Sequence, residues 1–380
     1  MILTEEQNIV RDTVRQYVQE RIAPFAAQWD RDRSFPAEAL KGLAELGFYG
    51  MLVPEQWGGC DIGYVTAAVV LEEIAAGDAA CSTVISVTNS VGCMPIYQFG
   101  NGQQKQKFLV PLASGQQLAA FCLTEPQAGS DASELRTKAV LDGDSYVLNG
   151  VKQFITSGKH ADIAIVFAVT DFSAGKKGIS AFIVPTKTPG YQVANIEHKL
   201  GQHASDTCQI LFEDCRIPVK NRLGEEGEGY KIALANLEGG RIGIAAQCVG
   251  IARAALEAAT KFANERRSFG EFLIKHQAIA FKLADMATQL SVARQMVFHA
   301  AHLKDAENPC LTEASMAKLF ASEMAEKVCS DAIQVHGGYG YLADFPVEKY
   351  YRDVRVCQIY EGTSEVQKMV ISRSLGKDSL

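Results

Sequence analysis

The period of the apolar residues changes twice along this chain. From Thr4 to about Leu118 it is helical, and "TEEQNIVRDTVRQYVQERI" opens with Thr4 and Gln7, the pair of a capping box. From about Ala119 to Gly229 the period shortens toward two, and from about Tyr230 onward the helical period returns in long segments. We therefore expect an α+β chain, mostly α, with an N-terminal helical domain, a middle antiparallel β-barrel-like domain and a C-terminal four-helix bundle.

We expect the domain boundaries at residues 1–118, 119–229 and 230–380. A chain of 380 residues with 47% hydrophobic side chains can bury several cores. Within the middle segment, "KAVLDGDSYVLNGVKQFITSG" predicts three strands joined by turns at Asp142-Gly143 and Asn149-Gly150, because both pairs favour positive φ.

Composition excludes several classes of function. The net charge of -7 argues against a dedicated nucleic-acid binder, and no HExxH, P-loop, GxSxG or zinc-ligand pattern occurs. The 10 Cys form no CxxC pair, which is typical of buried thiols in a reducing compartment. With no signal peptide and no apolar run of membrane-span length, we expect a cytoplasmic protein without membrane insertion, or a mitochondrial-matrix protein if the chain is already processed.

The stretch "QIYEGTSEVQ" places a lone carboxylate, Glu361, before Gly362, Thr363 and Ser364. Glycine lets a ligand approach the backbone, and the hydroxyls can hydrogen-bond a polar group. The alternative is a helix cap, with Thr363 or Ser364 as the N-cap of the last helix.

Other segments have similar pairs of interpretations. "FCLTEPQAGSD" and "QFITSG" offer neutral hydrogen-bonding groups and an aromatic ring suited to a heteroaromatic ligand, or are an ordinary loop and strand. "NERRSFG" could meet a diphosphate or complement a helix dipole, and "QVHGGYGY" could be a plain helix C-cap.

Taken together, the chain resembles the acyl-CoA dehydrogenase family. "LTEPQAGSD", "FITSG", "NERRSFG", "QVHGGYGYLADFPVEKYYRD" and "IYEGTSEVQ" occur in that family's order and spacing, and the resemblance covers essentially the whole chain. It implies FAD as cofactor and an acyl-CoA substrate, from which Glu361 removes the α-proton while hydride passes to flavin N5 to give a trans-2-enoyl-CoA.

The resemblance also implies roles for residues at matching positions. Residues Gln334 to Gly338 would reach FAD from the neighbouring subunit of a homotetramer. The implied cofactor-binding residues are Phe121, Cys122, Leu123, Thr124, Gly129, Ser130, Phe154, Ile155, Thr156, Arg266, Gln277, Gln334, Val335, His336, Gly337, Gly338, Thr363, Ser364 and Glu365. The implied substrate-binding residues are Ser130, Glu238, Gly239, Gly240, Arg241 and Gly362.

Departures from the family pattern limit the position of the base and the range of acyl-CoA substrates that we expect. Some members place their base immediately before the arginine that matches Arg241, and this chain has Gly240 there. Glu238 replaces a frequent Asp, and Phe154 replaces a frequent Trp. Because "AACSTVISV" carries no Arg to meet a distal carboxylate, a dicarboxylyl substrate is not expected. The closest similarity is to short-chain and short-branched members (butyryl, isobutyryl, 2-methylbutyryl), so we expect a C4 to C5 acyl-CoA.

The family's electron acceptor is electron-transferring flavoprotein, which is therefore the expected partner. Two other functions remain open. An acyl-CoA oxidase or related flavin oxidase would share the fold and pass electrons to O2, and a non-catalytic helical scaffold would lack the cofactor.

Overall fold

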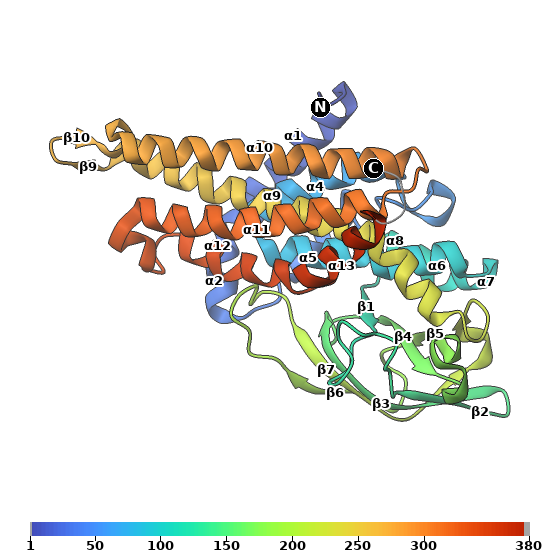
Figure 1. The fold of residues 1–380 in the computed structure, drawn as a ribbon. Coiled ribbons are helices and arrows are strands. Elements are labelled where there is room, and N and C mark those ends of the chain that lie inside the picture. Colours follow the sequence, from blue (N-terminus) through green and yellow to red (C-terminus); the bar gives the residue numbers. More distant parts are fainter. Residues whose placement is uncertain (1, 376–380) are drawn as a thin grey trace.

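The computed structural model describes residues 2–375. Long helices lie side by side in a bundle, and a β-domain packs beneath one part of it (Figure 1). The chain enters the β-domain at Ala119 and leaves it before Gly229, where the first long helix of the C-terminal segment begins.

The N-terminal segment is helical, as expected. Its helices are α1 (Glu5–Arg21), α2 (Ala23–Asp32), α3 (Ala37–Glu45), α4 (Gly63–Gly77), α5 (Ala79–Val87), α6 (Met94–Phe99), α7 (Gly102–Gln104) and α8 (Val110–Ala113). Wider π turns at Thr88–Cys93 and Lys105–Leu109 join α5 to α6 and α7 to α8. The capping box is confirmed, because Thr4 Oγ1 accepts from Gln7 N–H at 3.2 Å while Gln7 Oε1 accepts from Thr4 N–H at 3.0 Å.

The middle segment forms an eight-stranded sheet of order β6-β7-β3-β2-β4-β5-β8, with β1 paired to β4. Most strand pairs are antiparallel, as expected, but β1 and β2 each run parallel to β4, so the sheet is mixed. The strands are β1 (Ala119–Cys122), β2 (Lys138–Asp142), β3 (Ser145–Thr156), β4 (Ile163–Val169), β5 (Ile179–Pro185), β6 (Tyr191–Ile196), β7 (Thr207–Pro218) and β8 (Arg222–Leu223).

One of the two expected turns is wrong. Gly143 turns the chain between β2 and β3 with φ of 64°, but Asn149-Gly150 lies inside β3, at a shift in the register of β3 against β7. A Cβ on Gly150 would lie 2.5 Å from Thr137 Oγ1, so close approach of the neighbouring chain requires this glycine. The Asn149 side chain bonds Asp214 of β7 at 2.9 and 3.1 Å, which holds the pair as a bulge and not as a turn.

The C-terminal segment contains α9 (Gly229–Glu265), α10 (Gln277–Asp305), α11 (Leu311–His336), α12 (Val347–Val354) and α13 (Ser364–Leu375), with a small hairpin of β9 (Arg267–Ser268) and β10 (Glu271–Phe272) between α9 and α10. Helix α4, from the N-terminal segment, packs with α9 and α10 of the C-terminal segment. Where α9 passes α4 the two backbones approach closely, because a Cβ on Gly250 of α9 would lie 2.2 Å from the Glu72 carbonyl oxygen of α4. The two helical segments therefore share one hydrophobic core.

Contrary to the expectation of no apolar run of membrane-span length, two helical stretches, Ala79–Phe99 and Gly229–Glu265, are long and apolar enough to cross a membrane. However, 94% and 78% of their most apolar windows are buried in the protein, as in core helices of soluble proteins. All ten cysteines are free thiols and nine are buried, which confirms the expectation of buried thiols.

Candidate active site

Glu361 lies in the turn that precedes α13. Its φ is 53° and that of Gly362 is 88°, so both residues adopt left-handed backbone. This conformation is uncommon for a residue with a side chain, and it persists where the surrounding structure enforces it. Thr363 Oγ1 accepts from Val366 N–H at 3.3 Å, so Thr363 caps α13 as well. The segment therefore contains both the helix cap made by Thr363 and an uncommon left-handed turn at Glu361 and Gly362.

Buried side chains hold the carbonyl groups of this turn. Gln367 Nε2 donates to the Glu361 carbonyl oxygen at 3.0 Å and to the Gly362 carbonyl oxygen at 2.8 Å. Lys318 Nζ, from α11, donates to the Gly362 carbonyl oxygen at 2.7 Å. Both side-chain donors belong to residues with 0% exposure, so the turn is fixed from inside the protein.

The Glu361 carboxyl group packs against α9. A Cβ on Gly240 would lie 2.4 Å from Glu361 Oε1, so only glycine leaves room for the carboxyl group here. Burial raises the pKa of Glu361 to about 7, although the positive charges of Arg241 and Lys318 act to lower it. A carboxyl group that titrates near neutral pH can both accept and release a proton under physiological conditions.

Arg241 follows Gly240 and is 6% exposed. Its guanidinium donates to Ser315 Oγ at 3.2 Å, and its Nε has no hydrogen-bond partner within the described part of the chain. Burial lowers the pKa of Arg241, while Glu361 and Glu238 raise it. An incompletely bonded guanidinium beside a carboxyl group is suited to a polar ligand.

Glu238, which we expected in substrate binding, forms an ion pair within the chain. Its Oε1 accepts from Lys304 Nζ at 2.5 Å and from Cys310 Sγ at 3.4 Å. Gly239 lies against the Tyr64 ring, and a Cβ on Gly239 would lie 3.1 Å from Tyr64 Cε1. Helix α9 thus brings Gly239, Gly240 and Arg241 to one place, and Glu238 faces α10.

The loop after β1, residues 123–130, carries four of the residues expected around a flavin: Leu123, Thr124, Gly129 and Ser130. Glu125 in this loop accepts from Lys152 Nζ at 2.7 Å, from Arg136 N–H at 2.7 Å and from Thr137 N–H at 3.0 Å. Lys152 also donates to the Leu123 carbonyl oxygen at 3.0 Å. A fully buried ion pair therefore fixes the loop, and Gly129 and Ser130 remain exposed on it.

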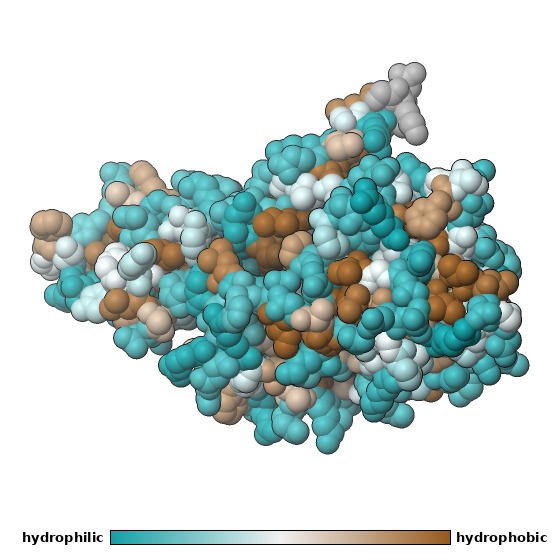
Figure 2. Space-filling model, turned by 90° about the horizontal axis from the view of Figure 1, so that it is seen from below, coloured by the Kyte–Doolittle hydropathy of each residue, from teal (hydrophilic) through white to brown (hydrophobic). Residues whose placement is uncertain are grey.

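Phe154 is 64% exposed and has φ of 59°, so an unusual backbone conformation directs a large apolar ring away from the core. Thr124 and Phe154 come from neighbouring segments, since Gln153 N–H donates to the Thr124 carbonyl oxygen at 2.8 Å. Figure 2 shows apolar side chains gathered across the middle of the face seen from below, within a hydrophilic surround. That face offers apolar surface for a ligand or partner to cover.

Two expected cofactor-binding side chains point elsewhere. Cys122 and Ile155 are 0% and 1% exposed and belong to the interior of the β-domain. Because successive side chains of a strand point to opposite faces, exposure of Phe154 directs Ile155 inward. Only the backbone of these two residues is available to a ligand.

A second group of expected residues gathers at the other end of the bundle, near the β9–β10 hairpin (Figure 1). A cavity of about 480 Å³ is lined there by Arg266 and by residues 334–338. Arg266 stacks over the Tyr339 ring at 5.4 Å, and Gln277 is the first residue of α10. Val335 and His336 are mostly buried, and the His336 ring stacks on Phe262, so exposed Gln334, Gly337 and Gly338 are the accessible members.

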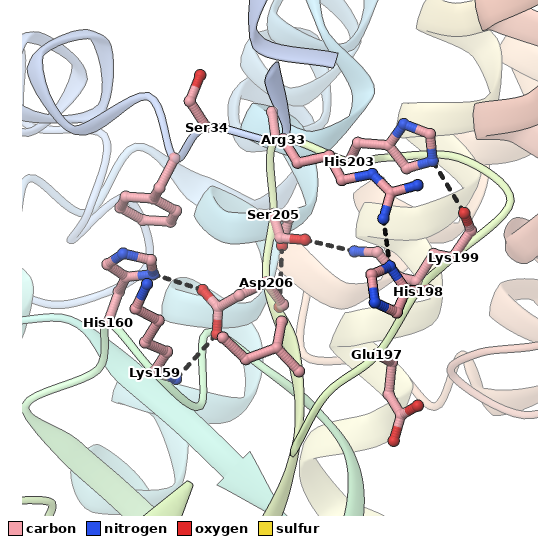
Figure 3. Close-up of a pocket in the computed structure, with 13 residues that line it drawn as sticks. Arg33, Ser34, Lys159, His160, Glu197, His198, Lys199, His203, Ser205 and Asp206 are labelled. Atoms are coloured by element: carbon pink, nitrogen blue, oxygen red, sulfur yellow. Dashed lines mark hydrogen bonds and ion pairs between the residues drawn. The ribbon is translucent and has the colours of Figure 1, made fainter. Parts of the chain in front are cut away.

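Another cavity, of about 350 Å³, contains none of the expected residues (Figure 3). Its polar groups bond one another: His160 Nδ1 lies 2.7 Å from Asp206 Oδ1, the backbone N–H of Lys159 donates to the same carboxylate at 2.8 Å, and Arg33 contacts His198. Phe35 stacks on His160 with ring centroids 4.0 Å apart. The cavity lies where the loop after α2 meets the sheet, and its side chains join these two parts.

Sequence reasoning missed Lys318, Gln367 and the Glu125–Lys152 pair. A signal for Lys318 exists, because "ASMAKLFASEMA" places this lysine on the face that Ala314, Ala317 and Ala321 bury. A lysine on an apolar stripe needs a partner or a function.

Family models cover nearly the whole chain. Residues 4–116 match the acyl-CoA dehydrogenase N-terminal domain, residues 120–215 its middle domain and residues 227–376 its C-terminal domain. The chain is 47% identical over 373 residues to the mitochondrial short-chain specific acyl-CoA dehydrogenase of Rattus norvegicus, which covers 98% of this chain and 90% of that protein.

Two solved structures are also close. Butyryl-CoA dehydrogenase from Megasphaera elsdenii superimposes with a TM-score of 0.97 at 44% identity and covers 99% of both chains. A chain in a structure described as the electron transferring flavoprotein of Acidaminococcus fermentans, studied for flavin-based electron bifurcation, superimposes with a TM-score of 0.98 at 46% identity and covers 100% of both chains.

Proposed function

The chain belongs to the acyl-CoA dehydrogenase family, and from this premise we propose that it introduces the Cα=Cβ double bond into a short-chain acyl-CoA with Glu361 as the base. The observation that carries the proposal is the Glu361 carboxyl group. It is held on a left-handed turn against Gly240, and burial raises its pKa to about 7.

Removal of an α-proton from a thioester requires a base whose pKa lies near the working pH. The Glu361 carboxylate would take the proton from Cα. Within residues 2–375, the Glu361 N–H donates to no protein acceptor, so it is free to donate to the thioester oxygen as negative charge develops there. One residue thus supplies both the base and a hydrogen-bond donor.

Enzymes of this family are FAD-dependent, and the residues present fit a flavin. Ser364 Oγ is buried and, among the described residues, has no hydrogen-bond partner. A Cβ on Gly129, Gly337 or Gly338 would meet no atom within 4 Å, which leaves room beside the backbone. Phe121, Thr124, Ser130, Phe154 and Thr156 would hold the flavin ring, and Thr363, Ser364 and Glu365 would close the site. Bound FAD would accept the hydride that leaves Cβ.

The end of the acyl chain would enter the space beyond Gly240. A cavity of only about 20 Å³ lies beside the neighbouring Gly239, where α4, α5 with the π turn after it, and α9 meet, and Leu71, Ser86, Asn89 and Gly243 also contribute to its lining. The residues that line it include no charged side chain. Both features favour a C4 to C5 acyl group over a long or dicarboxylyl one. Straight and branched chains of this size are both included in the proposal.

The positions of the expected FAD-binding residues also support a proposal for the oligomeric state. In a single chain, the cavity at Arg266 and residues 334–338 lies at the far end of the bundle from the β-domain (Figure 1). One FAD could use both groups of residues if the second came from another subunit, so we propose a homotetramer with FAD at a subunit interface. We also propose electron-transferring flavoprotein as the electron acceptor, supported by the related chain in the flavoprotein structure.

An anaerobic titration with butyryl-, isobutyryl-, 2-methylbutyryl-, octanoyl- and glutaryl-CoA tests the proposal. Bleaching of the flavin absorbance by a C4 or C5 thioester is the expected result, and it ranks straight against branched chains. A flavin-loaded protein that none of these thioesters bleaches would contradict the proposed activity. Stoichiometric peroxide under air would indicate the oxidase alternative.

A further inference from the structure

Lys318 is an unusual residue for its position in the fold. It lies in the middle of α11 on the face that Ala314, Ala317 and Ala321 bury, and its side chain has 0% exposure. A buried ammonium group is costly unless other groups compensate for its lost hydration. The compensation available to Lys318 therefore indicates what the residue does.

Two other buried lysines have carboxylate partners. Lys152 pairs with Glu125 at 2.7 Å, and Lys349 pairs with Asp78 at 2.9 Å and with Asp353 at 2.6 Å. Among the described residues, no carboxylate lies within ion-pair distance of Lys318. Its Nζ donates to the Gly362 carbonyl oxygen at 2.7 Å, in the turn that carries Glu361.

Lys318 and Glu361 also interact electrostatically, because each of them shifts the pKa of the other. Burial lowers the pKa of Lys318, while Cys248 of α9, Cys357 of the turn after α12 and Glu361 raise it and Arg241 lowers it. Glu361 is the carboxylate in this set. Seen from Glu361, the facing cations are Arg241 of α9 and Lys318 of α11.

We propose that Lys318 is a positioning residue for Glu361: its bond to the Gly362 carbonyl oxygen holds the left-handed turn, and its buried positive charge favours the carboxylate form of Glu361. This inference rests on the proposed role of Glu361 as the base. It adds a residue from a different helix, well before Glu361 in the sequence, to the groups that determine when that base is active.

The hydrogen bond and the charge have separable consequences. The Gly362 carbonyl oxygen accepts from both Lys318 and Gln367, so loss of one donor loosens the turn without freeing it. Loss of the charge leaves Arg241 as the remaining nearby cation. A neutral residue at position 318 would therefore raise the pKa of Glu361 and move its ionisation to higher pH.

The test uses the holoenzyme with Lys318→Met, which removes the donor and the charge, and Lys318→Gln, which removes the charge and keeps an N–H donor. The control is Lys327→Met on the same helix, since Lys327 is exposed and pairs with Asp331 at 2.9 Å. Infrared difference spectra recorded against pH, with Glu361→Gln as the reference, give the titration midpoint of the Glu361 carboxyl group without any substrate. Flavin bleaching by butyryl-CoA across the same pH range gives the kinetic midpoint.

We expect both Lys318 variants to raise the infrared midpoint by about one unit or more, the size typical of a nearby opposite charge. Bleaching at pH 7 should then fall roughly fivefold, since a midpoint that moves from about 7 to about 8 lowers the ionised fraction of Glu361 at pH 7 from about one half to about one eleventh. Lys318→Met should additionally lower the high-pH plateau, and Lys327→Met should leave both quantities unchanged.

An infrared midpoint that stays at the wild-type value in both Lys318 variants, with FAD content and unfolding temperature unchanged, would overturn the proposal. Failure of the wild-type protein to bleach with any acyl-CoA would contradict the proposed function alone. The carboxyl titration would still decide the role of Lys318.

Discussion

Gly240 lies directly against the carboxyl group of Glu361: a Cβ on Gly240 would be 2.4 Å from Oε1 and 3.0 Å from Cδ. These residues are far apart in the sequence and meet where α9 passes the turn before α13. Real Cβ atoms do not approach a carboxyl group this closely, so any side chain at position 240 must displace the base.

Gly240→Ala should therefore reduce dehydrogenation while the fold is retained. A base misplaced by about 1 Å costs roughly 10²-fold in rate, and we expect a loss of that order. The matched control is Gly102→Ala, because a Cβ on Gly102 meets no atom within 4 Å. Rates of flavin bleaching by butyryl-CoA measure the effect, and equal rates in the two variants would show that the contact with Gly240 does not position Glu361.

The rate of dehydrogenation should depend on pH through Glu361. Only the carboxylate accepts the α-proton, and the pKa of Glu361 is raised to about 7 by burial. The rate at limiting substrate should therefore rise about tenfold per pH unit below pH 7 and level off above it. Stopped-flow bleaching from pH 5.5 to 8.5 checks this, and a flat profile over that range would be inconsistent with Glu361 as the titrating base.

The raised pKa of Glu361 should also make folding stability depend on pH, but stability should fall with rising pH where the rate of dehydrogenation rises. The pKa of Glu361 is about 7 in the folded protein and near its ordinary value of 4.5 in the unfolded chain. Between these values the folded state holds a proton that the unfolded state has released, so the free energy of unfolding decreases as pH rises. Glu361→Gln has no such titrating group, so its free energy of unfolding relative to that of the wild type should increase by about 2 kcal/mol between pH 5 and pH 8.

Denaturant titrations of both proteins at pH 5 and pH 8 measure this difference. Glu365→Gln is the control, since Glu365 is exposed and should show no comparable gain. An advantage of Glu361→Gln that does not grow with pH would contradict a raised pKa at this site.

Lys152→Met should weaken both the β-domain and the binding of FAD. It leaves Glu125 buried without its cation, and loss of one partner of a buried pair costs about 3–5 kcal/mol. The loop from Leu123 to Ser130 would lose its anchor. Arg216→Met is the control, because the Arg216–Asp142 pair is exposed on the same domain and is worth about 0–1 kcal/mol. Urea unfolding and FAD titration measure the two effects, and equal stability of the two variants would contradict an anchoring role.

The sequence predicted the order of the helices and strands well, because long amphipathic periods are local properties. The prediction of a turn at Asn149-Gly150 was wrong, because this pair is typical of a turn but lies inside β3 as a bulge. The close approach of Thr137 and the bonds to Asp214 are contacts between strands, and no local pattern shows them.

At the candidate site, the motif around Glu361 was found from the sequence and its surroundings were not. The contact with Gly240 and the donors from Lys318 and Gln367 depend on how three helices pack. The Glu238–Lys304 ion pair is a similar case, since Lys304 lies on another helix. Cys122 and Ile155 lie in motifs that match the cofactor-binding segments, but a motif does not show which way a side chain points. In the structure both side chains face the interior.

The central claim is that Glu361 is the base that removes the α-proton, and anaerobic mixing of wild-type protein and Glu361→Gln with butyryl-CoA tests it most directly. The variant should bind FAD as the wild type does, and its flavin should bleach at least roughly 10² to 10⁴ times more slowly, since general-base catalysis contributes that much. Bleaching of the Glu361→Gln flavin at a rate near that of the wild type would contradict the claim.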